Sequence, residues 1–345
     1  MNQNSPAIYH RTAPFFSPRE LAVEIPPDTL SYSTIVKYRE AVRKILHGED
    51  NRFIVICGPC SIHDPASALE YADRLNDLRV LYEDKLIIIM RVYLEKPRSS
   101  IGWKGLINDP NMDGTCNIAE GLRSARKLLL SITSKGLAAG MELLDPLVSH
   151  YISDLASWVA IGARTSESQV HREMASGLSM PVGFKNPTNG NVESVINSIR
   201  SAIEPHSFLS INRDGQVCVS KTEGNPDSHL VLRGSIHGPN YEYDHIQAAK
   251  KIMMEKEITS RILIDCSHSN SGKKTLNQID VCKKVIAIKK STDIIAGIML
   301  ESNINDGQQS IPDDLSKLKY GISVTDDCLG WEKTGQLLKD IYQLL

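Results

Sequence analysis

Short apolar runs rich in β-branched residues alternate with longer segments of helical spacing along most of this chain. A strand repeats every two residues and a helix every 3.6, so the two kinds of segment differ in their spacing. Eight runs have the length and composition of buried strands, near 52–57, 86–92, 137–143, 157–162, 180–184, 229–233, 261–266 and 294–300. Strands that alternate with helices are typical of βα units around a parallel sheet.

A helical segment follows each of these runs, and this predicts an α/β fold of the TIM (β/α)8 barrel type. The segments lie near 65–80, 117–135, 148–156, 167–178, 191–204, 241–257, 276–290 and 332–344. Such a barrel needs about 250 residues, and the chain has 345. A doubly wound open sheet is the alternative, but the Gly-x-Gly-x-x-Gly loop that commonly follows its first strand is absent from this sequence.

The residues that a barrel does not need fall in two places. Residues 1–50 are polar and contain prolines, with one amphipathic stretch near 33–47, and we predict an N-terminal extension that makes oligomer or effector contacts. Within 206–222, two apolar runs flank an Asp-Gly pair, which favours a tight turn. We therefore expect one catalytic barrel over 51–345, with a β-hairpin insertion near 206–222.

Composition excludes several classes of protein. The 41 acidic and 39 basic residues nearly cancel, so no global field would attract nucleic acid or an anionic membrane. The longest apolar runs, such as 86–90, are far shorter than the roughly 20 residues of a membrane span. The first ten residues lack the pattern of a secretory signal, and seven scattered cysteines do not resemble a disulfide framework. We expect a cytoplasmic protein with reduced thiols.

Basic residues follow the predicted strands, where a barrel of this kind carries its functional side chains. They are Arg91, Lys96, Arg98, Arg164, Lys185 and Arg233. Unit charges about 4 Å apart interact by roughly 4 kcal/mol at an effective dielectric near 20, so such a cluster needs anions. Surface salt bridges would explain one such residue more readily than six at successive strand ends. The pattern predicts a bowl that binds carboxylates and phosphates.

Four further residues at the same strand ends form a candidate ligand set for a metal: Cys60, His268, Glu301 and Asp326. One thiol, one imidazole and two carboxylates suit Mn, Fe, Co or Zn better than Mg or Ca. Each residue alone also has a structural explanation, for example a buried Cys60 or a core His268. The four lie far apart in the sequence and form no compact motif, so their spacing alone is weak support.

Several long motifs occur together and in order. They are GPCSIHDP (58–65), MRVYLEKPR (90–98), GWKGLINDP (102–110), the stretch 160–186, DCSHSNS (265–271), ESNI (301–304) and SVTDDCLGW (323–331). From about residue 20 to the C-terminus, the chain resembles the 3-deoxy-D-arabino-heptulosonate 7-phosphate (DAHP) synthases of the microbial type that responds to aromatic amino acids. The resemblance implies a TIM barrel that condenses phosphoenolpyruvate with erythrose 4-phosphate and water, the first step of the shikimate pathway.

The resemblance also implies roles for the matching residues. Arg91 and Lys185 would hold the phosphoenolpyruvate carboxylate, and Arg164 and Arg233 its phosphate. Arg98 and Ser99 would hold the phosphate of the aldose. The resemblance further implies a divalent metal bound by Cys60, His268, Glu301 and Asp326, with Mn²⁺ as the first choice and Fe²⁺, Co²⁺ or Zn²⁺ as alternatives. Lys96, Glu142 and His268 would be the catalytic residues. We expect Lys96 to donate a proton and Glu142 to orient the water.

Some positions depart from the family pattern. Ser99 and Ser100 replace two threonines, Pro187 replaces a glycine, and RGSIHGPNY (233–241) lacks a usual glycine and lysine. A specialised paralogue or a sugar-acid synthase with another aldose phosphate therefore stays open, as does a catalytically silent regulatory partner. An aromatic amino acid effector, in a pocket that would include Ser179 and Ser210, and a homodimer or homotetramer are further implications of the resemblance.

Overall fold

Eight parallel strands close into a barrel in the computed structural model, which describes residues 13–98 and 101–345. The strands are β1 (Phe53–Gly58), β2 (Leu86–Arg91), β3 (Ala138–Glu142), β4 (Trp158–Ile161), β5 (Val182–Lys185), β8 (Ser228–Leu232), β9 (Ile262–Asp265) and β10 (Ile295–Glu301). The barrel closes where β1 pairs with β10, for example Ile54 opposite Gly297. The predicted TIM barrel is confirmed.

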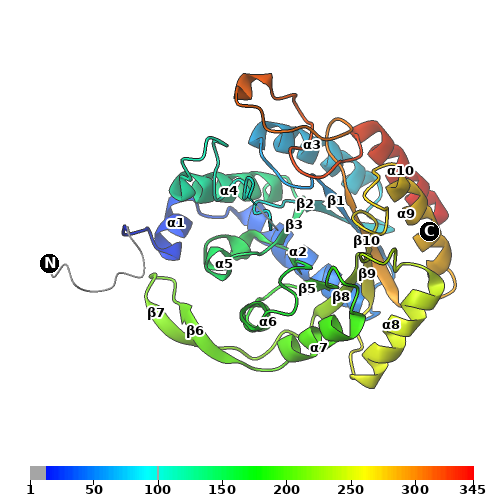
Figure 1. Cartoon of the computed structure of the whole chain (residues 1–345). Coiled ribbons are helices and arrows are strands. Elements are labelled where there is room, and N and C mark those ends of the chain that lie inside the picture. Colours follow the sequence, from blue (N-terminus) through cyan, green and yellow to red (C-terminus); the bar gives the residue numbers. More distant parts are fainter. Residues whose placement is uncertain (1–12, 99–100) are drawn as a thin grey trace.

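A helix follows every barrel strand and packs on the outside (Figure 1). These helices are α3 (Pro65–Leu81), α4 (Ile118–Thr133), α5 (Pro146–Ile152), α6 (Gln169–Ser176), α7 (Val192–Ile203), α8 (Tyr243–Glu255), α9 (Asn277–Lys289) and α10 (Trp331–Leu344). Side chains such as Phe53, Val55 and Leu86 fill the layer between barrel and helices. Where one helix was expected over 148–156, α5 ends at Ile152 and a short 3-10 turn, Ser153–Leu155, follows.

The N-terminal part adds two helices, α1 (Pro18–Glu24) and α2 (Thr29–Leu46). The sequence indicated only the second, and α2 begins earlier than expected because the Asp28 side chain accepts the backbone N–H of Ser31 at 2.7 Å and caps the helix. Val42, Ile45 and Leu46 of α2 join the cluster of side chains inside the barrel. This helix therefore closes the amino-terminal end of the barrel and leaves the carboxyl end open.

Between α7 and β8, the antiparallel strands β6 (Ser207–Ile211) and β7 (Val217–Lys221) form a two-stranded sheet apart from the barrel. Figure 1 shows this hairpin at the rim of the molecule, close to α1. The two are connected, because the backbone N–H of Arg19 bonds to the carbonyl of Arg213 at 2.8 Å. Within the described residues, no helix is long and apolar enough to span a membrane.

Candidate active site

The charged side chains at the strand ends continue the alternation of the barrel interior. In β2, Ile87 and Ile89 belong to the cluster inside the barrel, whereas Ile88 faces the outer helices. Arg91 has the same parity as Ile87 and Ile89, so it turns toward the barrel axis. The same alternation places further interior side chains at the ends of β3, β5, β8, β9 and β10: Glu142, Lys185, Arg233, Asp265 and Glu301.

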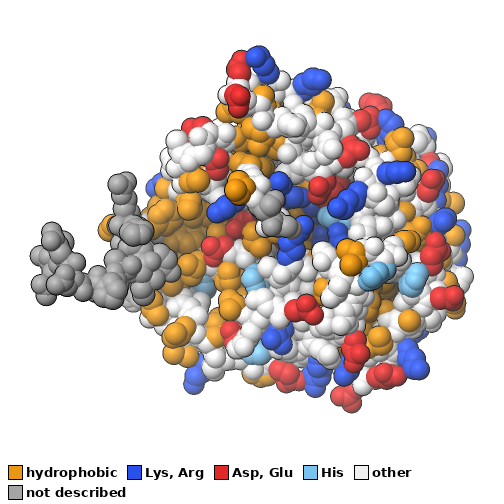
Figure 2. Space-filling model, viewed as in Figure 1, with side chains coloured by type: hydrophobic (Ala, Val, Ile, Leu, Met, Phe, Trp, Pro, Cys, Tyr) orange, Lys and Arg blue, Asp and Glu red, His pale blue; other side chains and the backbone are white. Residues whose placement is uncertain are grey.

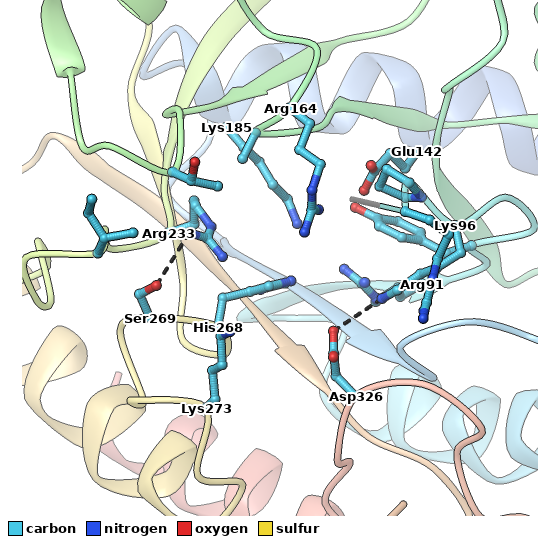
Figure 3. A pocket seen from close by; sticks show the side chains of 16 residues that line it. Arg91, Lys96, Glu142, Arg164, Lys185, Arg233, His268, Ser269, Lys273 and Asp326 are labelled. Carbon is cyan, nitrogen blue, oxygen red and sulfur yellow. Dashed lines mark hydrogen bonds and ion pairs between the residues drawn. The ribbon is translucent and has the colours of Figure 1, made fainter. Parts of the chain in front are cut away.

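Four of these side chains, Arg91, Glu142, Lys185 and Arg233, line a cavity of about 330 Å³ at the carboxyl end of the barrel. Figure 2 shows Lys and Arg side chains gathered in a hollow near the middle of this face. In Figure 3, Arg164, Lys185 and Arg233 converge on the cavity from one side, opposite Arg91 and Lys96. Seven basic residues line it: Arg91, Lys96, Arg98, Arg164, Lys185, Arg233 and Lys273. We call this cavity the cationic bowl.

Arg91 forms the floor of the bowl and is held on every side. Its Nη2 lies 2.9 Å from Glu301 Oε1, and its Nε donates to the carbonyl of Pro59 at 3.1 Å. The guanidinium group lies 3.5 Å from the centre of the Tyr93 ring. Because Arg91 is only 1% exposed, its position is fixed before any ligand arrives. A pre-organised guanidinium group suits two-point binding of a carboxylate or phosphate.

Lys185 and Asp265 form a second buried ion pair, with Nζ 3.0 Å from Oδ2. His268 Nδ1 lies 3.0 Å from the same carboxylate. Burial alone would raise the pKa of Asp265, but Lys185 and His268 outweigh it and hold this pKa well below its usual range. The carboxylate therefore stays ionised and fixes both the lysine and the imidazole at the edge of the bowl.

Three of the four predicted metal ligands come together directly: the donor atoms of Cys60, Glu301 and Asp326 lie within 4.8 Å of one another. The fourth is adjacent, since His268 Nε2 faces Glu301 Oε1 at 3.7 Å. Burial and the nearby Glu301 raise the pKa of the Cys60 thiol to about 12. A thiol, an imidazole and two carboxylates fit a divalent ion of intermediate softness, whose positive charge would favour the thiolate that ligation needs.

Lys96 links the ligand set to the bowl. Its Nζ lies 2.7 Å from Cys60 Sγ and 3.2 Å from Asp326 Oδ2. Glu142, which also lines the bowl, is 8% exposed and lies beside Gly162. A methyl group at Gly162 would come within 2.3 Å of Glu142 Oε1, so the absence of a side chain there leaves room for the carboxylate.

Arg233 and Arg164 lie close enough for their charges to interact. Burial and the nearby Arg164 lower the pKa of Arg233, against the opposite effect of Asp265. The backbone holds Arg233 in place, because its N–H donates to Asn186 Oδ1 at 2.8 Å, and its Nη1 donates to Ser269 Oγ at 3.3 Å. Two neighbouring guanidinium groups of this kind have the charge and the donors that suit a dianion.

Sequence reasoning therefore identified most of the bowl but missed several of its residues. Tyr93, Thr188, Ile236, Ser269 and Lys273 also line it. Parity could have indicated Tyr93, which lies two residues beyond Arg91, whereas the other four are in loops without a regular repeat. Arg98 lines the bowl as expected. Ser99, predicted beside it, lies outside the described residues.

A second cavity of about 580 Å³ lies between α5, α6 and the hairpin, and we call it the α5–α6 groove. Its lining includes Leu147, Met174 and Phe208, and a hydrogen bond of 3.0 Å joins His150 Nε2 to Ser210 Oγ. Ser210, one of the two residues predicted to line an effector pocket, therefore lines this groove. Ser179 is not among the lining residues, and Arg39 Nη1 donates to its hydroxyl at 2.8 Å.

Fold and site together define the class of a (β/α)8-barrel enzyme, with a cavity lined by basic side chains and a candidate metal-ligand set at the carboxyl ends of its strands. Comparison with known proteins identifies the family within this class. Residues 29–339 match the DAHP synthetase I family. The chain belongs to this family, whose members are aldol-type, carbon–carbon bond-forming enzymes.

Individual relatives agree. The Tyr-sensitive phospho-2-dehydro-3-deoxyheptonate aldolase of Escherichia coli K12 is 48% identical over 328 residues, which cover 95% of this chain and 92% of that protein. The Phe-sensitive aldolase of the same strain is 48% identical over 325 residues, 94% of this chain and 92% of that protein. The phospho-2-dehydro-3-deoxyheptonate aldolase of Francisella tularensis SCHU S4 superposes with a TM-score of 0.95 at 42% identity, covering 97% of this chain and 98% of that one.

Proposed function

We propose that this chain catalyses the reaction for which its relatives are named, the condensation of phosphoenolpyruvate with erythrose 4-phosphate and water to give DAHP and phosphate. This is the first step of the shikimate pathway. The observation that carries the proposal is that seven Lys and Arg side chains line one cavity of about 330 Å³, with a mixed metal-ligand set of thiol, imidazole and carboxylates at its edge.

In this proposal, phosphoenolpyruvate occupies the deep part of the bowl. Arg91 and Lys185 bind its carboxylate, since both are buried and anchored by carboxylates of their own. Arg164 and Arg233 bind its phosphate at the rim. The dianionic phosphate relieves the repulsion between these two guanidinium groups.

The aldehyde of the acceptor lies toward Lys96 and the ligand set of Cys60, His268, Glu301 and Asp326. A divalent ion held there, Mn²⁺ in the first place and Fe²⁺, Co²⁺ or Zn²⁺ as alternatives, would polarise the aldehyde oxygen. Lys96 donates a proton to that oxygen as carbon 3 of phosphoenolpyruvate attacks the aldehyde carbon. His268, held by Asp265, keeps its ring turned toward Glu301.

Bond formation at carbon 3 leaves positive charge on carbon 2, which water must meet. Glu142 lines the bowl between Lys96 and Arg164, and its carboxylate orients this water and accepts its proton. The carbon 2–oxygen bond to phosphate then breaks, and phosphate leaves toward Arg164 and Arg233. Arg98, which lines the bowl, binds the phosphate of the acceptor, and Ser99 is its expected partner in the sequence.

One observation favours a second candidate, a related reaction with another aldose phosphate. Ile236 lines the bowl and is 74% exposed, so an apolar side chain borders the space open to the acceptor. The test is phosphate release from phosphoenolpyruvate with Mn²⁺ and a panel of aldose phosphates. Turnover with erythrose 4-phosphate alone supports the main proposal, and turnover with another sugar alone supports the second. No turnover contradicts both.

We also propose an aromatic amino acid effector, an oligomeric state and a cellular location for this protein. The names of the relatives refer to tyrosine and phenylalanine sensitivity, and the α5–α6 groove combines apolar side chains with the His150–Ser210 pair, which suits an aromatic amino acid. We propose a homodimer or homotetramer, with α1 and α2 contributing contacts. The seven cysteines are free, which supports a reducing, cytoplasmic location.

A further inference from the structure

One buried carboxyl group beside the bowl has no role in the mechanism above. Glu95 precedes Lys96, is 2% exposed and does not line the bowl. Its Oε2 accepts the backbone N–H of Leu144 at 3.2 Å and that of Asp145 at 3.4 Å. Both belong to the loop that follows β3 and therefore follow Glu142 closely. Glu95 thus connects the loop after β2 to the loop after β3.

The same loop is held from the opposite side. His171, in α6, has its Nε2 2.7 Å from the carbonyl oxygen of Leu144. That carbonyl and the N–H of Asp145 belong to one peptide group, so Glu95 and His171 grip the same peptide from both ends. His171 is itself oriented by Ser168, whose hydroxyl lies 3.0 Å from Nδ1. We call Glu95, His171 and the peptide between Leu144 and Asp145 the Leu144 clamp.

The surroundings of Glu95 disfavour an ionised carboxylate, and its bonds to the loop offset this cost. Burial raises the pKa of Glu95 to about 7, and the nearby carboxylates of Asp145 and Glu142 act in the same direction. The two backbone N–H groups oppose this effect. A buried carboxyl group that faces two other carboxylates stays ionised at neutral pH only in part, and what favours its charged form is the pair of bonds to the loop.

We propose that Glu95 is a positioning residue, which acts through the Leu144 clamp to fix Glu142 and Lys96 relative to each other. The inference rests on the proposed function. Lys96 is one residue from Glu95, and Glu142 is two residues from Leu144. The clamp therefore joins the segment that carries the proton donor to the segment that carries the water-orienting carboxylate. A displacement of about 1 Å between catalytic groups can lower turnover by roughly 10²-fold.

Two variants distinguish a positioning role of Glu95 from a contribution to protein stability alone. Glu95→Gln keeps the shape and one amide oxygen as acceptor, whereas Glu95→Leu keeps the volume and removes both acceptors. The matched control is Asp109→Leu, which removes another buried carboxyl group, whose Oδ2 accepts the N–H of Gly114 at 3.2 Å without contact to the clamp. Each is compared with the wild type, loaded with Mn²⁺, by steady-state kinetics and by hydrogen exchange of the Leu144 and Asp145 amides.

For Glu95→Leu we expect kcat to fall by about tenfold or more, with KM for phosphoenolpyruvate within about twofold, because Arg91, Lys185 and Arg233 do not depend on the clamp. The two amides should exchange faster. Glu95→Gln should recover most of kcat and the protection of the amides. Asp109→Leu should lower the thermal midpoint but leave kcat unchanged.

The pH profile gives a further readout. Since the charged form of Glu95 is the better acceptor, kcat of the wild type should fall modestly as the pH drops through about 7, toward the level of Glu95→Gln. The variant has a neutral acceptor at every pH, so this part of the decline should disappear in it. Groups facing Glu95 are Asp145 and Glu142, and His171 lies across the peptide.

An active wild type with an equally active Glu95→Leu would overturn the clamp and leave the proposed function intact. Equal losses in Glu95→Gln and Glu95→Leu, with both amides still protected, would also overturn it. If the wild type releases no phosphate, the proposed function fails, and amide exchange alone decides whether the clamp holds the loop.

Discussion

The close contact between Gly162 and Glu142 predicts that a substitution at Gly162 lowers activity strongly while changing stability little. A methyl group at Gly162 would lie 2.3 Å from Glu142 Oε1 and 3.1 Å from its Cδ. Ordinary carbon–oxygen contacts are about 3.3 Å, so in Gly162→Ala the carboxylate has to move by about 1 Å. Only the end of a flexible side chain moves, and the next neighbour, Thr165 Oγ1, is 3.7 Å away.

We therefore expect the free energy of unfolding to change by less than about 1.5 kcal/mol, while kcat falls by roughly 10²-fold because the water is no longer aligned with carbon 2. The assay is steady-state phosphate release, paired with urea unfolding. Gly335→Ala is the control, because this helical glycine has its nearest neighbour, Leu78 Cδ1, at 3.9 Å. It should gain up to about 1 kcal/mol and keep full activity. Full turnover by Gly162→Ala would refute the role given to Glu142.

Three further predictions concern charge, pH and metal. Asp265→Asn leaves Lys185 buried without its counter-charge, so the free energy of unfolding measured in urea should fall by about 3 kcal/mol. The control, Asp214→Asn in the exposed pair with Arg19, should lower it by under about 0.5 kcal/mol. Equal losses would show that the buried pair is worth no more than the exposed one. Burial lowers the pKa of His229 to about 4 from an unfolded value of 6.5, so the unfolded chain takes up the proton first and stability should fall by about 3 kcal/mol between pH 6.5 and 4. His229→Gln should lack that part of the loss, and an unchanged pH dependence would show that His229 does not cause it. Cys60→Ala should abolish turnover stimulated by Mn²⁺ and retain the wild-type circular dichroism; activity that persists would rule out the metal assignment.

The barrel could be predicted from sequence because each strand carries its own signal. Runs such as 86–90 are apolar on both faces, as expected for strands covered by helices outside and side chains inside. The same reasoning could not find α1, whose seven residues hold only two buried side chains, Pro18 and Leu21. A helix this short has too little periodicity to be recognised, and it depends on contacts such as that between Arg19 and Arg213.

The site could be predicted in part, for a related reason. Arg91, Glu142 and Lys185 are the last residues of their strands and continue the row of interior side chains, so a repeat of two residues was enough to bring them together. Loop geometry follows no repeat. The backbone of His268 has a φ of 54°, which the sequence does not indicate, and this turn accompanies the ring contacts to Asp265 and Glu301. The Leu144 clamp joins residues almost fifty positions apart and depends on a buried carboxyl group that resembles any surface glutamate in the sequence.

The central claim is that this bowl joins phosphoenolpyruvate to erythrose 4-phosphate with water added at carbon 2. The most direct measurement is the reaction in water labelled with oxygen-18, with Mn²⁺ present and the product and phosphate analysed by mass spectrometry. We predict that DAHP forms and that the released phosphate carries no label, because water attacks carbon and the carbon–oxygen bond breaks. Labelled phosphate, or phosphate released without DAHP, would contradict it.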